Sequence, residues 1–167
     1  MLYSIRFGVA SGLSQGRPET DLGDDIQTGF GKANYDILSA HKGAYMKKKV
    51  LLVEDNPATI DVLQKELSFL GYDSIVAEDG KQAVEKAASL LPDMIIMDIS
   101  LPKMDGLEAT SAIRKNPKTQ SIPILAATAR ALPGDKEKCI QAGCDDYLAK
   151  PFSHRELGAA IKKLLKE

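Results

Sequence analysis

Short apolar runs alternate with longer amphipathic segments along the chain from residue 47 onward. Each run is apolar throughout, which is typical of parallel strands buried on both faces. The segments between them carry apolar residues every three or four positions, which predicts helices with one buried face. We expect strands at 50–53, 74–77, 94–97, 123–127 and 146–149, and helices around 60–70, 80–90, 107–115, 135–142 and 155–166. The pattern therefore predicts an α/β fold, a (βα)₅ doubly wound five-stranded parallel sheet covered by helices.

Two helix starts carry a recognisable signal. Asn56 is a good N-cap residue, and Pro57 suits the first helical turn. Ser153 and Glu156 have the spacing of a capping box, which predicts the start of the last helix.

Residues 1–46 lack this regular pattern. The stretch ASGLSQG at 10–16, for example, cannot bury enough apolar surface to offset the entropy of ordering it. We expect 1–46 to be a largely disordered N-terminal extension and 47–167 to form the folded domain. Met46 stands directly before the three lysines at 47–49 and the first predicted strand. Either Met46 is the true start and the extension is not native, or the extension is a docking or localising tail.

Composition narrows the class of protein. The 22 Lys and Arg residues against 23 Asp and Glu leave a net charge of −1, which argues against direct nucleic-acid binding. Two cysteines are too few for a disulfide scaffold and favour a reducing compartment. Because no apolar stretch is long enough for a membrane span or a secretory signal, we expect a cytoplasmic protein without membrane insertion.

Charged and polar side chains stand where four of the predicted strands end. Glu54 and Asp55 follow the first run, Asp98 the third, Thr128 the fourth and Lys150 the fifth. Because the carboxyl ends of parallel strands meet at one edge of a sheet, we expect these side chains to converge. Three neighbouring carboxylates need a compensating cation, and hard oxygen ligands suit Mg²⁺.

The same residues suggest phosphoryl chemistry. Lys150 supplies a charge suited to phosphate and Thr128 a hydroxyl donor, while no Gly-rich phosphate loop follows the first strand. The chemistry that remains is an aspartate attacking phosphorus, with Mg²⁺, Lys150 and Thr128 neutralising charge. Taken alone, Glu54 and Asp55 are equally well explained as acids at the start of a helix.

Four motifs occur in order: LVEDN at 52–56, MDISLP at 97–102 with Asp105-Gly106, ATA at 127–129 and KPF at 150–152. With them, residues 49–166 resemble a response-regulator receiver domain of two-component signalling, which has a CheY-like and flavodoxin-like fold. The resemblance implies the strand order 2-1-3-4-5. Among stand-alone receivers, the QAGCD segment at 141–145 and the Asn56-Pro57 junction favour a DivK-like over a chemotaxis-type regulator.

The resemblance assigns roles to the acidic residues and to their neighbours. Asp98 would be the phosphoacceptor. Glu54, Asp55, Asp98 and the main-chain carbonyl of Ser100 would hold Mg²⁺. Ser100 and Arg130 would flank the phosphoryl group and tune its lifetime.

Further roles fall on the last two strands. Thr128 and Lys150 would bind the phosphoryl group, and the Lys150–Pro151 peptide bond would be cis. Tyr147 would be a switch aromatic whose rotamer follows Thr128, although an aromatic residue at a strand end is often simply packed.

The leading interpretation is a phosphorylation-dependent switch of a two-component system or phosphorelay. A histidine kinase or histidine phosphotransfer protein would donate the phosphoryl group to Asp98, and the surface formed by 131–142 and 153–166 would then bind a downstream protein. The domain would catalyse only its own phosphorylation and dephosphorylation, so we expect no enzyme in the ordinary sense. Because the chain ends with the last predicted helix, we expect no DNA-binding output domain.

Kinase specificity is expected on the first helix, near Ala58, Ile60, Asp61 and Gln64.

Two alternatives belong to other classes of protein, and a third is a variant of the leading interpretation. A Mg²⁺-dependent phosphohydrolase with an aspartate nucleophile would resemble a pattern with a second acid where this chain has Ser100. A flavin-binding module is disfavoured by the acids after the first strand. The variant is a receiver fragment of a hybrid histidine kinase, with 1–46 as a linker remnant. It ranks below the stand-alone receiver because that segment contains no kinase-like motif.

Overall fold

The computed structural model describes residues 47–129 and 134–167. Within them, five parallel strands form one sheet in the order β2-β1-β3-β4-β5, which confirms the predicted fold class and strand order. The strands are β1 (Lys49–Val53), β2 (Asp73–Ala77), β3 (Met94–Met97), β4 (Ile124–Thr128) and β5 (Asp146–Ala149). The helices are α2 (Pro57–Phe69), α3 (Gly80–Leu90), α4 (Gly106–Lys115), α5 (Asp135–Ala142) and α6 (His154–Leu165). The predicted extension 1–46 lies outside the described residues.

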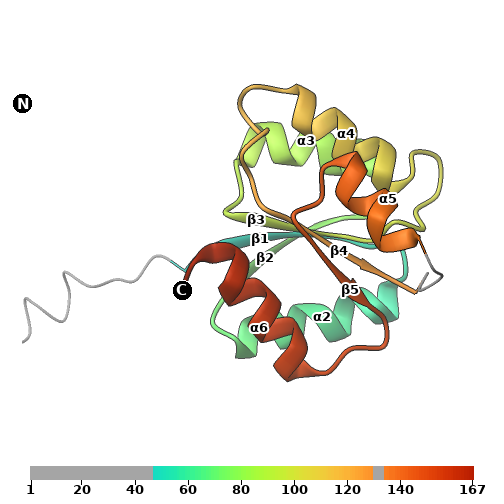
Figure 1. The fold of residues 1–167 in the computed structure, drawn as a ribbon. Helices are drawn as coiled ribbons and strands as arrows, with labels where there is room; N and C mark the ends of the chain where they lie inside the picture. The colour runs from blue at the N-terminus through green and yellow to red at the C-terminus, as the bar shows by residue number, and fades with distance from the viewer. Residues whose placement is uncertain (1–46, 130–133) are drawn as a thin grey trace, which may run out of the picture. The chain divides into compact units, whose positions relative to one another are not determined.

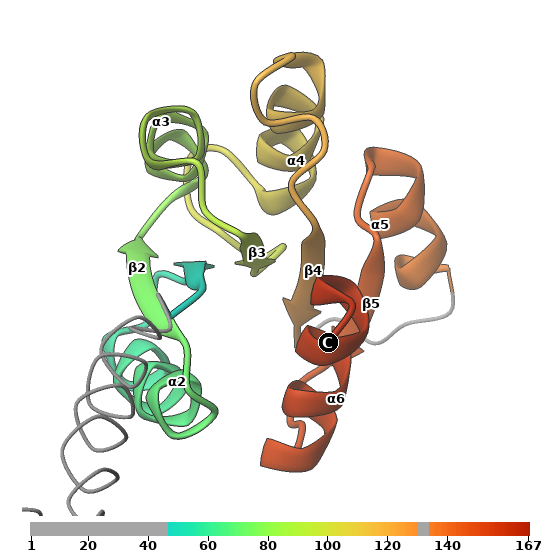
Figure 2. The same ribbon diagram turned by 90° about the vertical axis from the view of Figure 1, so that its left-hand side faces the viewer.

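Helices cover both faces of the sheet (Figure 1, Figure 2). α3, α4 and α5 lie on one face, and α2 and α6 lie on the other. Val50 and Leu52 of β1 pack with α2 and α6, whereas Leu51 and Val53 pack with the helices of the opposite face. Successive residues of a strand point to opposite faces. A strand covered on both sides is therefore buried at every position, as β3 and β4 are.

One residue of the expected kinase-recognition surface is misplaced. Ile60 is buried on the inner face of α2, where it packs with the core, so its assignment to that surface is wrong. Ala58 and Asp61 are exposed and Gln64 is half-buried. Ile60 belongs to the apolar stripe that fixes α2 to the sheet, and a residue cannot serve both surfaces.

Side chains cap the starts of α2, α3, α4 and α6. The predicted caps are confirmed. The side chain of Asn56 accepts a hydrogen bond from the backbone amide of Thr59 in α2. Ser153 forms a capping box with Glu156 at the start of α6. Asp79 and Asp105 cap α3 and α4 in the same way. Each cap satisfies backbone donors that a helix terminus leaves without a partner. Within 47–129 and 134–167, no helix is both long and apolar enough to cross a membrane.

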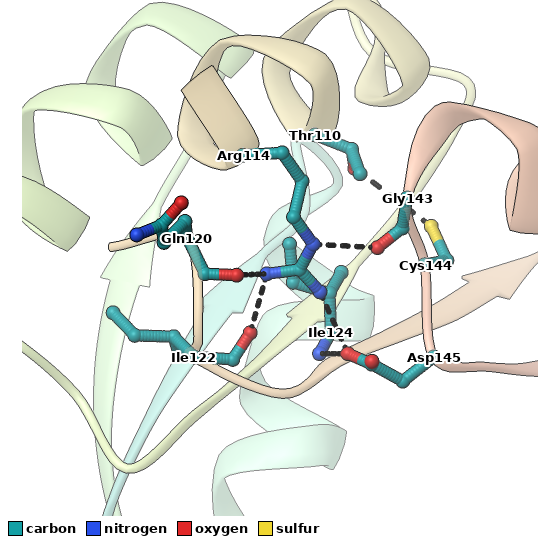
Figure 3. A network of polar contacts seen from close by, with 8 residues as sticks. All are labelled: Thr110, Arg114, Gln120, Ile122, Ile124, Gly143, Cys144 and Asp145. Carbon is teal, nitrogen blue, oxygen red and sulfur yellow. Dashed lines mark hydrogen bonds and ion pairs between the residues drawn. The ribbon is translucent and has the colours of Figure 1, made fainter. Parts of the chain in front are cut away.

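Arg114, in the last turn of α4, joins three segments at the amino edge of the sheet (Figure 3). Its guanidinium donates to the carbonyl oxygens of Gly143 and Ile122, both at 2.7 Å, and of Gln120 at 3.0 Å. It also pairs with Asp145 at 2.7 Å. Asp145 also accepts from the amide of Ile124 at 2.7 Å. Because the guanidinium holds its donors in a rigid plane, one side chain fixes the end of α4, the start of β4 and the turn before β5.

Replacing Arg114 by Met should lower the free energy of unfolding by about 2–4 kcal/mol, because a carboxylate and three carbonyls lose a charged donor at a part-buried position. Urea unfolding of the full chain measures the change. Arg155→Met, at an exposed residue of α6, is the control and should change the free energy by no more than about 0.5 kcal/mol. A loss for Arg114→Met no larger than that of the control would contradict the structural role of Arg114.

Candidate functional site

Four of the predicted site residues lie at the carboxyl edge of the sheet. Glu54 follows β1, Asp98 follows β3, Thr128 ends β4 and Lys150 follows β5. Glu54, Asp98 and Thr128 are only 3%, 8% and 1% exposed. The structure therefore buries two carboxylates near one edge, where a cation has to accompany them.

Lys150 is that cation. Its Nζ donates to Asp98 Oδ2 at 2.8 Å and also to Glu54 Oε2. Burial disfavours the charged form of the side chain, but the hydrogen bonds and charges of Asp98 and Glu54 outweigh it and raise the pKa of Lys150 above its ordinary value of 10.5. Lys150 therefore stays protonated at neutral pH and compensates one of the two negative charges.

Backbone amides hold the second oxygen of each carboxylate. Ser100 N donates to Asp98 Oδ1 at 2.8 Å, and Asn56 N donates to Glu54 Oε1 at 3.2 Å. Both carboxylates are thus fixed by a backbone donor on one side and by Lys150 on the other. Neither amide was singled out from the sequence, since an amide has no residue type to recognise.

Asp55, the third predicted carboxylate, is exposed at the end of β1. Among residues 47–129 and 134–167, no three His, Cys, Asp or Glu side chains lie close enough together to share a metal ion. The oxygen ligands still suit a hard cation, because Glu54, Asp98 and Lys150 together carry one net negative charge. Asp55, which follows Glu54 in the chain, adds a further carboxylate. The Mg²⁺ ligands therefore stay a prediction.

The loop from Asp98 to Asp105 carries the other predicted metal ligand, the carbonyl of Ser100. Ser100 is exposed, and the loop closes where Gly106 N donates to the carbonyl of Ile99 at 3.1 Å. A Cβ at Gly106 would lie 2.2 Å from the carbonyl oxygen of Asp98, so only glycine permits this approach. Glycine in the DG motif is therefore explained by close packing behind Asp98.

Tyr147 is half-buried on β5 and packs against the core on the side of α3, α4 and α5. Burial raises the pKa of its hydroxyl group, with smaller contributions from Cys139 and Asp135. A cavity of about 50 Å³ lies beside Thr128, lined by Ile99, Leu107, Thr128, Asp135, Lys138 and Cys139. The proposed switch pair thus borders α5, while Arg130 lies outside the described residues.

An open groove of about 430 Å³ lies beside Lys150, between α2 and the segment that follows β5. Its lining residues are Ala58, Thr59, Val62, Leu63, Lys150, Pro151 and Phe152. The Lys150–Pro151 peptide bond is cis, as predicted. Val62 and Phe152 were not predicted as site residues. One sequence signal could have indicated Val62, because it is an apolar residue that lies off the buried stripe of its helix. In the structure its side chain is 57% exposed.

The sequence profile described as response regulator receiver domain matches residues 50–162. This chain belongs to that family. Its members are receiver domains of two-component systems, signalling proteins that act through phosphorylation rather than enzymes in the ordinary sense.

Relatives of different lengths share this domain. DivK of Brucella anthropi, a polar-differentiation response regulator, is 37% identical over 120 residues, which cover 72% of this chain and 98% of DivK. The transcriptional regulatory protein PhoP of Bacillus subtilis, which acts in alkaline phosphatase synthesis, is 41% identical over 121 residues, which cover 72% of this chain but 50% of PhoP. A Dictyostelium discoideum hybrid histidine kinase is 44% identical, but the match spans 7% of its length.

Solved structures agree with the fold. The receiver domain of the sensor histidine kinase PA1611 from Pseudomonas aeruginosa has 44% sequence identity and a TM-score of 0.69, covering 72% of this chain and 99% of that domain. That structure holds a magnesium ion coordinated in the active site cleft. The Vibrio cholerae chemotaxis protein CheY4 has 30% identity and a TM-score of 0.67, covering 71% of this chain and 98% of CheY4.

Replacing Lys150 by Met should lower the free energy of unfolding by about 2–4 kcal/mol in buffer without divalent cations, because two buried carboxylates then lack a cation. Lys163→Met is the matched control. Lys163 also pairs with an acid, Asp146 at 2.8 Å, but its side chain is exposed, so we expect a loss of no more than about 1 kcal/mol. Equal losses in urea unfolding would show that Lys150 does not compensate buried charge.

Proposed function

We propose that this domain is a phosphorylation-dependent switch in which Asp98 accepts a phosphoryl group from the phosphohistidine of a histidine kinase or histidine phosphotransfer protein. The observation that carries the proposal is the buried contact of Asp98 with Lys150 beside Glu54. The Ser100 amide already holds one oxygen of Asp98, so the nucleophile is oriented before a donor arrives.

The transfer needs no further catalyst from the donor. An oxygen of Asp98 attacks phosphorus while the bond from phosphorus to the imidazole nitrogen of the donor breaks. That nitrogen keeps the electron pair, and the ring takes a proton from water and leaves as neutral imidazole. Lys150 and the hydroxyl of Thr128 bind oxygens of the phosphoryl group. Glu54, Asp55, Asp98 and the carbonyl of Ser100 would hold Mg²⁺, which neutralises phosphoryl charge when bound.

The switch is reversible by the same site. A water molecule attacks the phosphorus of the acyl phosphate, which restores the Asp98 carboxylate and releases inorganic phosphate. The domain thus catalyses only its own phosphorylation and dephosphorylation, with Ser100 and Arg130 flanking the phosphoryl group and tuning its lifetime. Ser100 also separates this site from a phosphohydrolase, which would carry an acid there.

Signal output would depend on the side of the site formed by Thr128, Tyr147 and α5. Thr128 would follow the phosphoryl group, and Tyr147 would adjust beside α5, which changes the surface of α5 and α6 seen by a downstream protein. The DivK match spans almost the whole of that regulator, whereas the PhoP match spans half. We propose protein–protein output in the cytoplasm, without membrane insertion, and the net charge of −1 favours output without direct nucleic-acid binding.

The groove between α2 and Phe152 is the surface best placed to receive the donor. Lys150 is one of its lining residues and contacts Asp98, so a protein seated there would bring its phosphohistidine to the Asp98 edge. The exposed side chain of Val62 offers an apolar contact to such a protein.

Incubation with a small acyl phosphate and Mg²⁺ should add a single phosphoryl group to the chain, as measured by intact mass. Asp98→Asn should remove the adduct, because the amide cannot act as the nucleophile. EDTA should prevent it in the wild type, because the acidic edge then lacks its second cation. An adduct that persists in Asp98→Asn, or that forms in EDTA, would contradict the proposal.

Replacing Val62 by Asp should slow transfer from a phosphorylated histidine phosphotransfer protein by about tenfold or more, because a carboxylate in the apolar groove loses its hydration when the donor docks. The rate with the small acyl phosphate should stay within about twofold, since that donor needs no groove. Leu90→Asp, at an exposed apolar residue of α3, is the control. Equal slowing with both donors would place the effect of Val62 in the chemistry and not in docking.

A further inference from the structure

The first turn of α3 packs directly against the loop between β3 and α4. A Cβ at Gly80 would lie 2.5 Å from the carbonyl oxygen of Met104 and 2.8 Å from its Cγ. Because the nearest atom belongs to the backbone, turning a side chain cannot relieve such a clash. Glycine is therefore required here by the close approach of two backbone segments.

Lys103 sits at the tip of the same loop. Its φ of +67° lies in the left-handed region, which residues other than glycine and asparagine rarely adopt. Its Nζ is 3.6 Å from Asp79 Oδ2, but the side chain is 81% exposed, so this ion pair stabilises little. The hydrogen bond from the Gln82 amide, helped by Lys103, lowers the pKa of Asp79. The backbone contact at Gly80, and not the ion pair, is the stronger constraint on the loop.

The first half of the loop carries the proposed phosphoacceptor. Backbone hydrogen bonds hold it in place, independently of the contact at Gly80. Asp98 N donates to the carbonyl of Val53 at 3.0 Å, and Ser100 N donates to the Asp98 carboxylate at 2.8 Å. Gly106 N closes the loop on the carbonyl of Ile99 at 3.1 Å. The loop is thus anchored to β1 at its start and to α4 at its end.

The connection between these anchors and the tip is short and stiff. Leu101, Pro102 and Lys103 separate Ser100 from Met104. Leu101 is buried in the core, and the ring of Pro102 fixes its own φ. Few backbone torsions between Met104 and Ser100 are free to change. A displacement of Met104 is therefore expected to displace Ser100 as well.

We propose that the contact of Gly80 with Met104 positions the phosphorylation loop, so that the amide and carbonyl of Ser100 keep their places beside Asp98. The inference rests on the proposed function, in which the Ser100 carbonyl holds Mg²⁺. Gly80 and Met104 touch no reacting atom, so both are positioning residues. The edge strand β2 thereby contributes to the site through the helix that follows it, although its own end lies away from Asp98.

Hydrogen–deuterium exchange of the metal-free full chain tests the contact without any phosphorylation. Gly80→Ala should speed exchange in the peptide covering 98–106 by about threefold or more, because the loop has to move to admit the new Cβ. Gly158→Ala is the matched control. It also adds a Cβ to a buried helical glycine, but its nearest neighbour is the end of the Leu70 side chain at 3.1 Å, which can move, so the loop should keep its wild-type exchange.

Calorimetric titration with Mg²⁺ gives the second readout. Gly80→Ala should raise the Mg²⁺ dissociation constant by about tenfold, as loss of support behind a metal ligand typically does, and Gly158→Ala should leave it unchanged. Met104→Ala examines the same contact from the loop side and should move both readouts in the same direction by less, since the backbone approach remains.

The outcomes separate the two claims. Loop exchange and Mg²⁺ affinity that change no more in Gly80→Ala and Met104→Ala than in Gly158→Ala would overturn the positioning role, even if the melting temperature falls. A wild type that binds no Mg²⁺ would overturn the proposed metal site, and the exchange of 98–106 would then decide the positioning role alone.

Discussion

Lys150 places one ammonium between two carboxylates that the sheet buries side by side. Without it, Glu54 and Asp98 would be two like charges in a poorly hydrated site, which is costly. The parallel order of β1, β3 and β5 forces this meeting, because each residue follows the carboxyl end of its strand. One ammonium cannot neutralise both acids. The edge therefore keeps a net negative charge that suits a metal ion. Under the proposed function, Lys150 would also bind the phosphoryl group.

The two edges of the sheet differ in construction. At the amino edge, Arg114 fixes α4, β4 and the turn before β5 with short, charge-assisted hydrogen bonds. At the carboxyl edge, loops carry the functional groups and are held by close backbone approaches at glycine, namely Gly106 behind Asp98 and Gly80 against Met104. Under the proposed function, rearrangement would concentrate at the carboxyl edge, beside the groove and α5, where a donor and a downstream protein would bind.

The sequence was most informative where a pattern has one physical cause. Uninterrupted apolar runs arise from burial on both faces, so the strands were predictable, whereas their order came from the family resemblance. The strand-end residues such as Asp98 and Lys150 followed from the parallel sheet. Ile60 was misassigned because one helical pattern holds both core and surface positions. The contacts of Arg114 and of Gly80 with Met104 were out of reach, because they join segments that only the folded chain brings together. The DGLE capping box at Asp105 had a sequence signal that was not used.

The central claim is that Asp98 is the residue that carries the phosphoryl group. Borohydride reduces an acyl phosphate to an alcohol, so reduction of the phosphorylated chain followed by peptide sequencing by mass spectrometry locates the modified residue. The account predicts homoserine at position 98, with Glu54 and Asp55 unchanged. Reduction at either of those neighbours, with Asp98 intact, would contradict it.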